Sequence, residues 1–214
     1  MIKIKNDDVE TALAPTPWDL GNQVLYDLCR KFSNHTQDDV IIAKVMLIGR
    51  VYAAAIERRK NKETKDVSDE FYINAVAPTL KESQLDEWLT SLPVPGEMAD
   101  TWNNLVDVVT LHKRLTDIFF RMTNMNKRSL ASKYLHFHRP DLFFIYDSRA
   151  EESIKQITPR LNLIRNISAS LHDCAYLKFC RRAQFLRDQI SDRFGMVLTP
   201  RQIDNLLLRT KIDR

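Results

Sequence analysis

Residues 127–152 are KRSLASKYLHFHRPDLFFIYDSRAEE, and the fold is inferred outward from this stretch. The spacing of its first apolar residues predicts a helix over 128–138. The apolar face of that helix consists of Leu130, Tyr134, Leu135 and Phe137. Asn126 stands just before the helix and can cap it, whereas Pro140 ends it, because proline lacks an N–H donor and disfavours helical geometry in the preceding residue.

Five apolar residues follow, from Leu142 to Tyr146, and they predict a buried, extended segment. Asp147 and Ser148 then offer an N-cap for a second helix, in which Glu151 and Glu152 lie early, where the helix dipole favours negative charge. An aspartate held in this way suits a functional site. It suits an ordinary helix cap equally well.

The composition points to an all-α protein. The 214 residues contain only four glycines, which argues against a barrel, a sandwich or a glycine-rich phosphate loop. We expect a single domain with two helical lobes, roughly residues 1–95 and 96–214, divided at the Pro93–Gly96 break. Three cysteines, no apolar signal segment and no apolar run of about 20 residues lead us to expect a cytoplasmic protein without a membrane span.

Several elements are predicted outside the opening stretch. Met1 to Lys5 alternates like a short edge strand, and residues 7–15 look irregular. Thr16-Pro17 begins a helix that runs to about Phe32. Its apolar face is predicted from i+4 spacing to be Leu20, Val24, Leu28 and Phe32. A central helix is expected over 40–56, and a long basic helix over 168–194 that ends at Gly195. Thr199-Pro200-Arg201-Gln202 is a second cap-and-proline start, which opens a last short helix through Leu208.

The charge is unevenly distributed. Residues 1–111 hold 12 Lys and Arg against 18 Asp and Glu, a formal charge of −6, whereas residues 112–214 hold 20 against 10, a charge of +10. A basic C-terminal half suggests a polyanionic partner, most simply nucleic acid. A solvated basic surface is the alternative.

No metal site is expected. His136 and His138 lie two apart in a predicted helix, so they point to different sides and do not readily share one metal ion. Cysteine, histidine and acidic residues show no zinc or calcium spacing, and no nucleotide-binding loop or nucleophile elbow is present. The two histidines therefore favour a structural, hydrogen-bonding role.

Lys127 and Asp147 are the candidate catalytic pair. A helix, a turn and a returning segment between them bring the chain back, so both residues can meet at helix starts. A lysine out of water and beside a positive dipole end has a depressed pKa and becomes nucleophilic, and an adjacent aspartate stabilises positive charge. A surface lysine and a capping aspartate would have the same spacing.

This stretch resembles the helix-hairpin-helix DNA glycosylases, most nearly the 8-oxoguanine DNA glycosylase branch. The likeness consists of a hairpin before a lysine, a helix, a proline turn, an apolar run and an aspartate that opens the next helix. SLASKYLHFHRPDLFFIYDS is also similar to bacterial proteins of that fold in anti-phage defence systems such as type IV CBASS. The resemblance implies a two-lobed all-α fold in which Lys127 attacks C1′ and forms a Schiff base, Asp147 stabilises the oxocarbenium charge, and no cofactor is needed.

The hairpin departs from the family, because Thr123-Asn124-Met125-Asn126 contains no glycine. Asparagine tolerates the left-handed conformation, so a turn remains possible. Nucleic-acid contacts are expected from Asn124, Asn126, Arg128, Lys178, Arg181 and Arg182. The pocket is expected to be lined by Lys133, Tyr134 and His136.

Three interpretations are compatible with these residues, the third being an all-α scaffold without a small-molecule pocket. The first is a divergent glycosylase that cleaves the N-glycosidic bond of a modified base in nucleic acid through a lysine Schiff base, in the setting of anti-phage defence. The second is a non-catalytic protein of that fold that binds nucleic acid, a nucleobase or a protein partner encoded in a defence operon.

Overall fold

The structure is a computed structural model that describes residues 2–58, 68–93, 102–161 and 170–209. Within those ranges every regular element is a helix and no strand occurs, as the low glycine content predicts. The elements are α1 (Asn6–Leu13), α2 (Asp19–Lys31), α3 (Asp38–Val51), α4 (Ser68–Phe71), a π-helical turn (Tyr72–Val76), α5 (Ala77–Lys81), α6 (Leu85–Thr90), α7 (Trp102–Thr123), α8 (Arg128–His138), α9 (Ser148–Ile157), α10 (Cys174–Phe194) and α11 (Pro200–Arg209).

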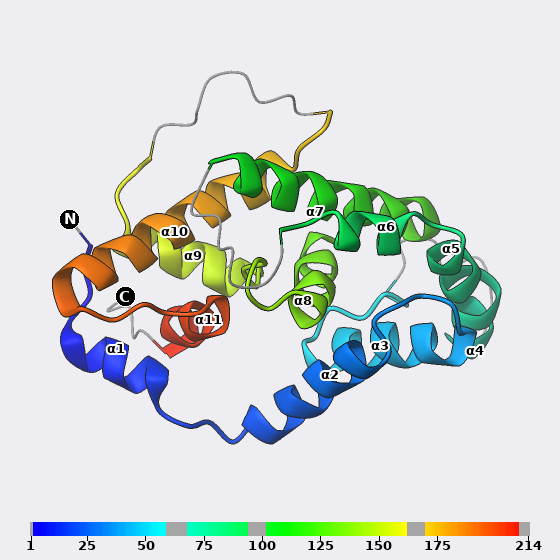
Figure 1. The fold of residues 1–214 in the computed structure, drawn as a ribbon, viewed down its shortest axis with the longest axis horizontal. Coiled ribbons are helices and arrows are strands. Elements are labelled where there is room, and N and C mark those ends of the chain that lie inside the picture. The colour runs from blue at the N-terminus through cyan, green and yellow to red at the C-terminus, as the bar shows by residue number, and fades with distance from the viewer. Residues whose placement is uncertain (1, 59–67, 94–101, 162–169, 210–214) are drawn as a thin grey trace.

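Helix α8 is the centre of the molecule (Figure 1). It packs against α2, α3 and α7, and every residue from Leu130 to Phe137 is buried. The apolar face predicted for this helix is therefore buried, but so are its polar side chains Ser132, Lys133 and His136. A helix buried on all sides must satisfy such polar groups internally, and this requirement shapes the candidate site.

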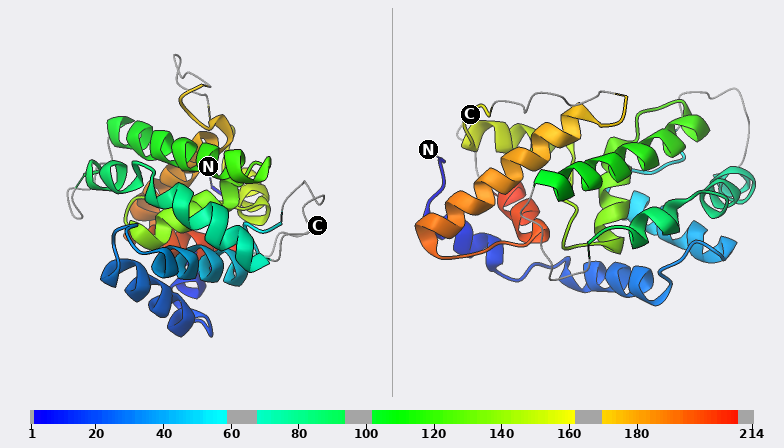
Figure 2. Two further views of the ribbon diagram at one scale, coloured as in Figure 1. Left: turned by 90° about the vertical axis from the view of Figure 1, so that its right-hand side faces the viewer. Right: turned by 45° about the horizontal axis from the view of Figure 1, so that its top comes forward.

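The other helices lie on either side of α8. Helices α2 to α6 gather at one end, whereas α9, α10 and α11 gather at the other, with α7 running beside α10 (Figures 1 and 2). Helix α1 packs against α11, so the first helix belongs with the C-terminal elements. The predicted break at Pro93–Gly96 falls, apart from Pro93, outside the described residues.

Several predicted helix ends are confirmed. The Asp147 carboxylate accepts a hydrogen bond from the Ala150 N–H and caps α9. Thr199 and Gln202 exchange backbone and side-chain hydrogen bonds at the start of α11, which is a capping box. Gly195 ends α10 in the left-handed conformation, with φ of 68°.

Four local predictions are wrong, and the central helix expected over 40–56 ends early, at Val51. Residues 2–5 form no strand, although Ile2 and Ile4 are buried. Residues predicted to be irregular form α1, because Val9 and Ala12 are buried when α1 packs on α11. Helix α10 begins at Cys174 rather than near Ser168, because Asp173 caps it; residues 162–169 lie outside the described part.

The fourth wrong prediction concerns the face of α2. Leu20 and Val24 are 79% and 57% exposed, whereas Asn22, Leu25 and Cys29 are buried. The i+4 series of apolar residues thus points largely to solvent. Tertiary packing on α3 and α8 selected a different face of this helix.

Candidate nucleic-acid interface

Asp147 is an N-cap that also takes part in an ion pair. Its Oδ2 lies 3.4 Å from the Nζ of Lys133, one and a half turns along α8, while its Oδ1 caps α9. The Asp147 side chain is 27% exposed, and that of Lys133 only 4%. The aspartate of the predicted pair is therefore matched with Lys133 rather than with Lys127.

Lys127 binds elsewhere. Its ammonium group donates hydrogen bonds to the carbonyls of Ala55, at 3.0 Å, and Arg58, at 2.6 Å. Burial lowers the pKa of this amine, in the predicted direction. The two carbonyl acceptors favour its charged form and hold it beneath the segment that follows α3.

Lys133 has a similar structural role. Besides Asp147, it donates to the Tyr52 carbonyl at 3.2 Å and to the Ser129 hydroxyl at 3.0 Å. Lys133 thus binds the carbonyl of the residue that caps the C-terminus of α3, where the helix dipole favours positive charge, whereas Lys127 binds carbonyls of the segment that follows. This anchoring explains why both side chains are buried.

Tyr134 and His136, the other two predicted pocket residues, are also hydrogen-bonded in the interior. His136 donates from Nδ1 to the Phe143 carbonyl, so its Nε2 accepts from the Tyr26 hydroxyl at 2.7 Å. Burial lowers the pKa of His136 to about 4, so the ring is neutral near pH 7. The Tyr134 hydroxyl lies 2.7 Å from Nε2 of His35.

One acid beside the Lys133–Asp147 pair is incompletely satisfied. Asp204 of α11 is 2% exposed; its Oδ2 accepts from Arg201 at 3.1 Å, and its Oδ1 has no hydrogen-bond partner among the described residues. Burial raises the pKa of Asp204 to about 7, opposed by Arg201 and reinforced by the negative charge of Asp147. This carboxyl is thus part protonated near neutrality.

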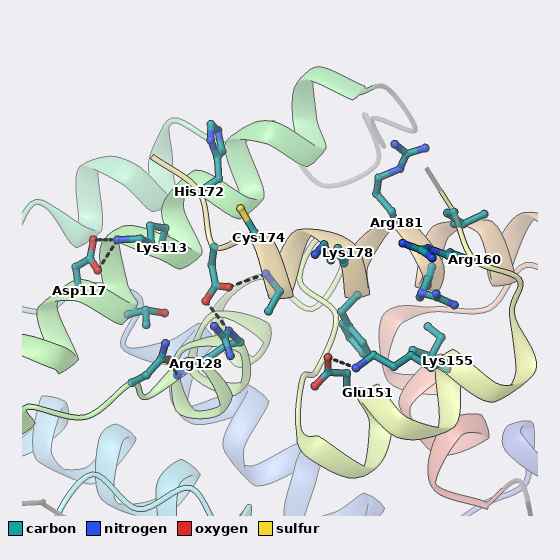
Figure 3. Close-up of a pocket in the computed structure, with 18 of the residues that line it drawn as sticks. Lys113, Asp117, Arg128, Glu151, Lys155, Arg160, His172, Cys174, Lys178 and Arg181 are labelled. Carbon is teal, nitrogen blue, oxygen red and sulfur yellow. Dashed lines mark hydrogen bonds and ion pairs between the residues drawn. The ribbon is translucent and has the colours of Figure 1, made fainter. Parts of the chain in front are cut away.

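A cavity in the described part lies at the start of α8, and neither Lys133 nor Asp147 lines it. It has a volume of about 940 Å³ and is bounded by α7, the start of α8, α9 and the first turns of α10 (Figure 3). We call it the basic cavity, because seven cationic side chains line it: Lys113, Arg128, Lys155, Arg160, Lys178, Arg181 and Arg182.

Three acids also line the basic cavity, and each already has a cationic partner. Asp117 pairs with Lys113 at 2.5 Å, and Glu151 pairs with Lys155 at 2.5 Å. Asp173 pairs with Arg128 at 2.5 Å and also caps α10. Although burial opposes its ionisation, the hydrogen bond from Arg128 lowers the pKa of Asp173, so this acid is fully charged.

The remaining cations exceed the available carboxylates. Lys178 and Arg160 are exposed and form no hydrogen bond or ion pair with any residue that the structure describes. Arg182 donates to three oxygen atoms of Thr158 and Pro159, and its pKa is lowered by burial and then by the nearby charge of Arg160. Among the described residues the cavity thus has more cations than carboxylates, and this excess of positive charge attracts an anion.

The basic cavity brings together most of the residues predicted to bind nucleic acid. Asn126, Arg128, Lys178, Arg181 and Arg182 all line it, although they come from two regions about 50 residues apart in sequence. Asn124 does not line it; it forms the left-handed residue of the turn after α7, with φ of 52°. The glycine-free hairpin is therefore built on an asparagine.

Sequence reasoning missed four residues of these two clusters. Lys113, Lys155 and Arg160 complete the cavity, and Asp204 lies beside the Lys133–Asp147 pair. The excess of positive charge after residue 111 indicated that basic residues such as Lys113, Lys155 and Arg160 could bind an anion, but it did not indicate which of them do. Asp204 gave no signal, because its position next to Asp147 depends on how α11 packs on α9.

A metal centre has no basis in the described residues, among which no group of three or more histidine, cysteine, aspartate or glutamate side chains could hold a metal ion. No helix in the same ranges is long and apolar enough to cross a membrane. No protein-family model, curated protein or solved structure matches this chain.

Proposed function

We propose that this chain binds nucleic acid, DNA in the first instance, in the basic cavity. One observation carries the proposal: seven cationic side chains line a cavity in which all three acids are already paired. Phosphate groups supply the missing negative charge, and binding releases their counterions. Lys178 and Arg160 are the side chains best able to contact phosphate directly, because neither has a carboxylate partner in the described part.

Charge reversal at one lysine tests the proposal. In Lys178→Glu, we expect the dissociation constant for a fluorescein-labelled DNA oligonucleotide, measured by anisotropy at about 50 mM salt, to rise about 10-fold. The slope of log K against log salt should fall by about one, as expected for the loss of one phosphate contact. This loss of affinity is larger than removal of the lysine charge alone would cause, because the new glutamate also repels the phosphate.

Lys31→Glu is the matched control. Lys31 is an exposed lysine of α2, a helix that lies away from α10 (Figure 1); it does not line the basic cavity, and its replacement changes the net charge equally. Its binding should stay within about twofold of the wild type, because a single distant charge is screened by salt. Equal losses in both variants would indicate non-specific attraction and contradict binding in the cavity.

Cleavage of an N-glycosidic bond is a second candidate function, which the close Lys133–Asp147 pair favours. In this chemistry an amine attacks C1′, the base leaves with the bonding electrons and takes up a proton, and loss of a proton and ring opening leave an iminium. Lys133 would have to break its hydrogen bonds to Tyr52 and Ser129 before attacking. The pair predicted from the sequence, Lys127 with Asp147, is the competing assignment.

Borohydride trapping separates the two lysines. Reduction of the iminium joins protein and DNA covalently, and the product is counted on a denaturing gel with abasic and modified-base duplexes. Loss of trapping in Lys133→Gln but not Lys127→Gln assigns Lys133, and the reverse assigns Lys127. Absence of trapping in the wild type would leave DNA binding as the function.

A further inference from the structure

One aromatic side chain at the basic cavity is not used by the core. Phe120 of α7 lines the cavity and is 48% exposed, whereas its neighbour Phe119 is fully buried and packs edge-on to Tyr134. Exposure of a phenyl ring to water is unfavourable in free energy. Single aromatic side chains on a protein surface are nevertheless common. Beside a cavity lined by cations, however, such a ring has a specific use in binding nucleic acid.

We infer that the ligand of the basic cavity is single-stranded nucleic acid, one base of which stacks on Phe120 while neighbouring phosphates contact the cations. The inference rests on the proposed function and deepens it. In a duplex, each base face is covered by the next base pair, so a phenyl ring cannot stack on it without unstacking the helix. In a single strand the base faces are accessible, and stacking on aromatic side chains combined with a cationic groove is the usual mode of binding.

The arrangement of the cavity walls agrees with an extended strand. Phe120 follows Asp117 by about one turn of α7, and the Lys113–Asp117 pair lies at one end of the cavity (Figure 3). Arg160 and Lys178 lie toward the other end (Figure 3). A ligand that reaches both the ring and these two cations spans the cavity, which suits several linked nucleotides better than one free nucleotide.

The concave shape points the same way. The cations of Arg128 and Lys155 come from helices that form the cavity wall, and Arg128 is partly buried. The phosphates of a duplex follow a stiff convex surface, whereas the backbone of a single strand can bend into a recess. Single-stranded nucleic acid therefore brings its charge nearer to these groups.

Anisotropy with two labelled probes tests the inference: an oligothymidylate of about 12 nucleotides and a DNA hairpin duplex of the same number of phosphates. We expect the single strand to bind at least about fivefold tighter. Phe120→Ala and Phe120→Leu should each weaken binding of the single strand about 10-fold and alter duplex binding by less than about twofold, since stacking is lost and charge is unchanged. The leucine variant keeps an apolar side chain, so it isolates the aromatic face.

Trp18→Ala is the matched control for an exposed aromatic, because Trp18 is 71% exposed and does not line the cavity. It should leave binding of both probes within about twofold. As a second measurement, oligothymidylate with 5-iodouracil at its centre should cross-link on irradiation to the tryptic peptide that contains Phe120. Cross-linking does not depend on whether the variants fold normally.

Each outcome bears on one of the two proposals. Tighter binding of the duplex, unchanged binding in Phe120→Ala, or competition by thymidine monophosphate as effective per phosphate as the oligonucleotide would overturn the single-strand inference. In those cases a loss in Lys178→Glu still supports the proposed function. If neither probe binds, or Lys178→Glu binds both as the wild type does, the proposed function itself fails.

Discussion

Basic side chains occur in two very different settings in this protein. Lys127 and Lys133, around α8, are buried, and every hydrogen bond of their amines goes to carbonyls, a hydroxyl or a carboxylate of the protein. Lys178 and Arg160, at the basic cavity, are exposed and have no described protein partner. The first pair stabilises the fold, and the second pair is available to a ligand.

The lysines of the sequence motif are therefore not the cations that are free to contact a ligand. The stretch with the strongest sequence signal contains the two lysines whose donors are already used. The cations with donors to spare are Lys178, on α10, and Arg160, which follows α9; the sequence signal of both was only charge. The hydrogen-bond partners of each cation thus show which amines are already bound within the protein, and spacing in the sequence does not show this.

Replacing one lysine of each setting by methionine should give the strongest contrast in stability. Lys133→Met leaves the Tyr52 carbonyl without this donor and Asp147 without its cation, so we expect a loss of about 3–4 kcal/mol in the free energy of unfolding. Urea denaturation measures it. Lys178→Met should change that free energy by less than about 0.5 kcal/mol. Equal effects would show that the two settings do not differ in what they contribute to the fold.

The titration of Asp204 tests whether the charges of Lys133, Asp147, Arg201 and Asp204 balance one another in the interior. Its pKa is about 7 in the folded protein, above the value of about 3.9 in an unfolded chain. This carboxyl therefore stabilises the fold fully below about pH 4, and the contribution is lost as the pH rises through about 7. Asp204→Asn removes this contribution to the pH dependence of folding stability, because asparagine does not titrate.

We expect the stability of Asp204→Asn relative to the wild type to rise by about 3 kcal/mol between about pH 4.5 and about pH 8. Urea denaturation of both proteins at intervals of half a pH unit measures this difference. Groups that titrate alike in the two proteins do not contribute to it. Because the asparagine variant also loses charge-assisted pairing with Arg201, only the change with pH is diagnostic. Parallel curves would show that Asp204 is ionised throughout and that its environment is more polar than its burial indicates.

Two turns with left-handed residues should respond more weakly. Ala53, with φ of 53°, follows α3 between the carbonyls that bind the two interior lysines, and Asn124, with φ of 52°, forms the turn before α8. Ala53→Gly should stabilise the protein by about 1 kcal/mol, since alanine is strained there. Asn124→Gly should gain only a few tenths, because asparagine tolerates this conformation. Thermal unfolding checks both, and a larger gain at Asn124 would reverse the ranking.

Much of the local structure could be predicted from the sequence. The N-cap at Asp147, the capping box at Thr199 and the stop at Gly195 depend on interactions within a few residues, and all three are confirmed. The burial of Leu130, Tyr134, Leu135 and Phe137 followed from their helical spacing, whereas that of Ser132, Lys133 and His136 did not. The faces of α2 and the existence of α1 could not be predicted, because both depend on which distant helix lies alongside.

The candidate sites divide in the same way. Composition and local hydrogen bonding are enough to specify that the chain is helical, that its second half is basic, and that Asp147 is fixed at a helix start. Helix packing was needed to specify that Asp147 meets Lys133, that Lys127 binds carbonyls, and that five of the predicted nucleic-acid residues share one cavity with Arg160. Charge pairing depends on distances of a few ångströms between helices, and such distances are set by packing, because spacing along the chain does not fix them.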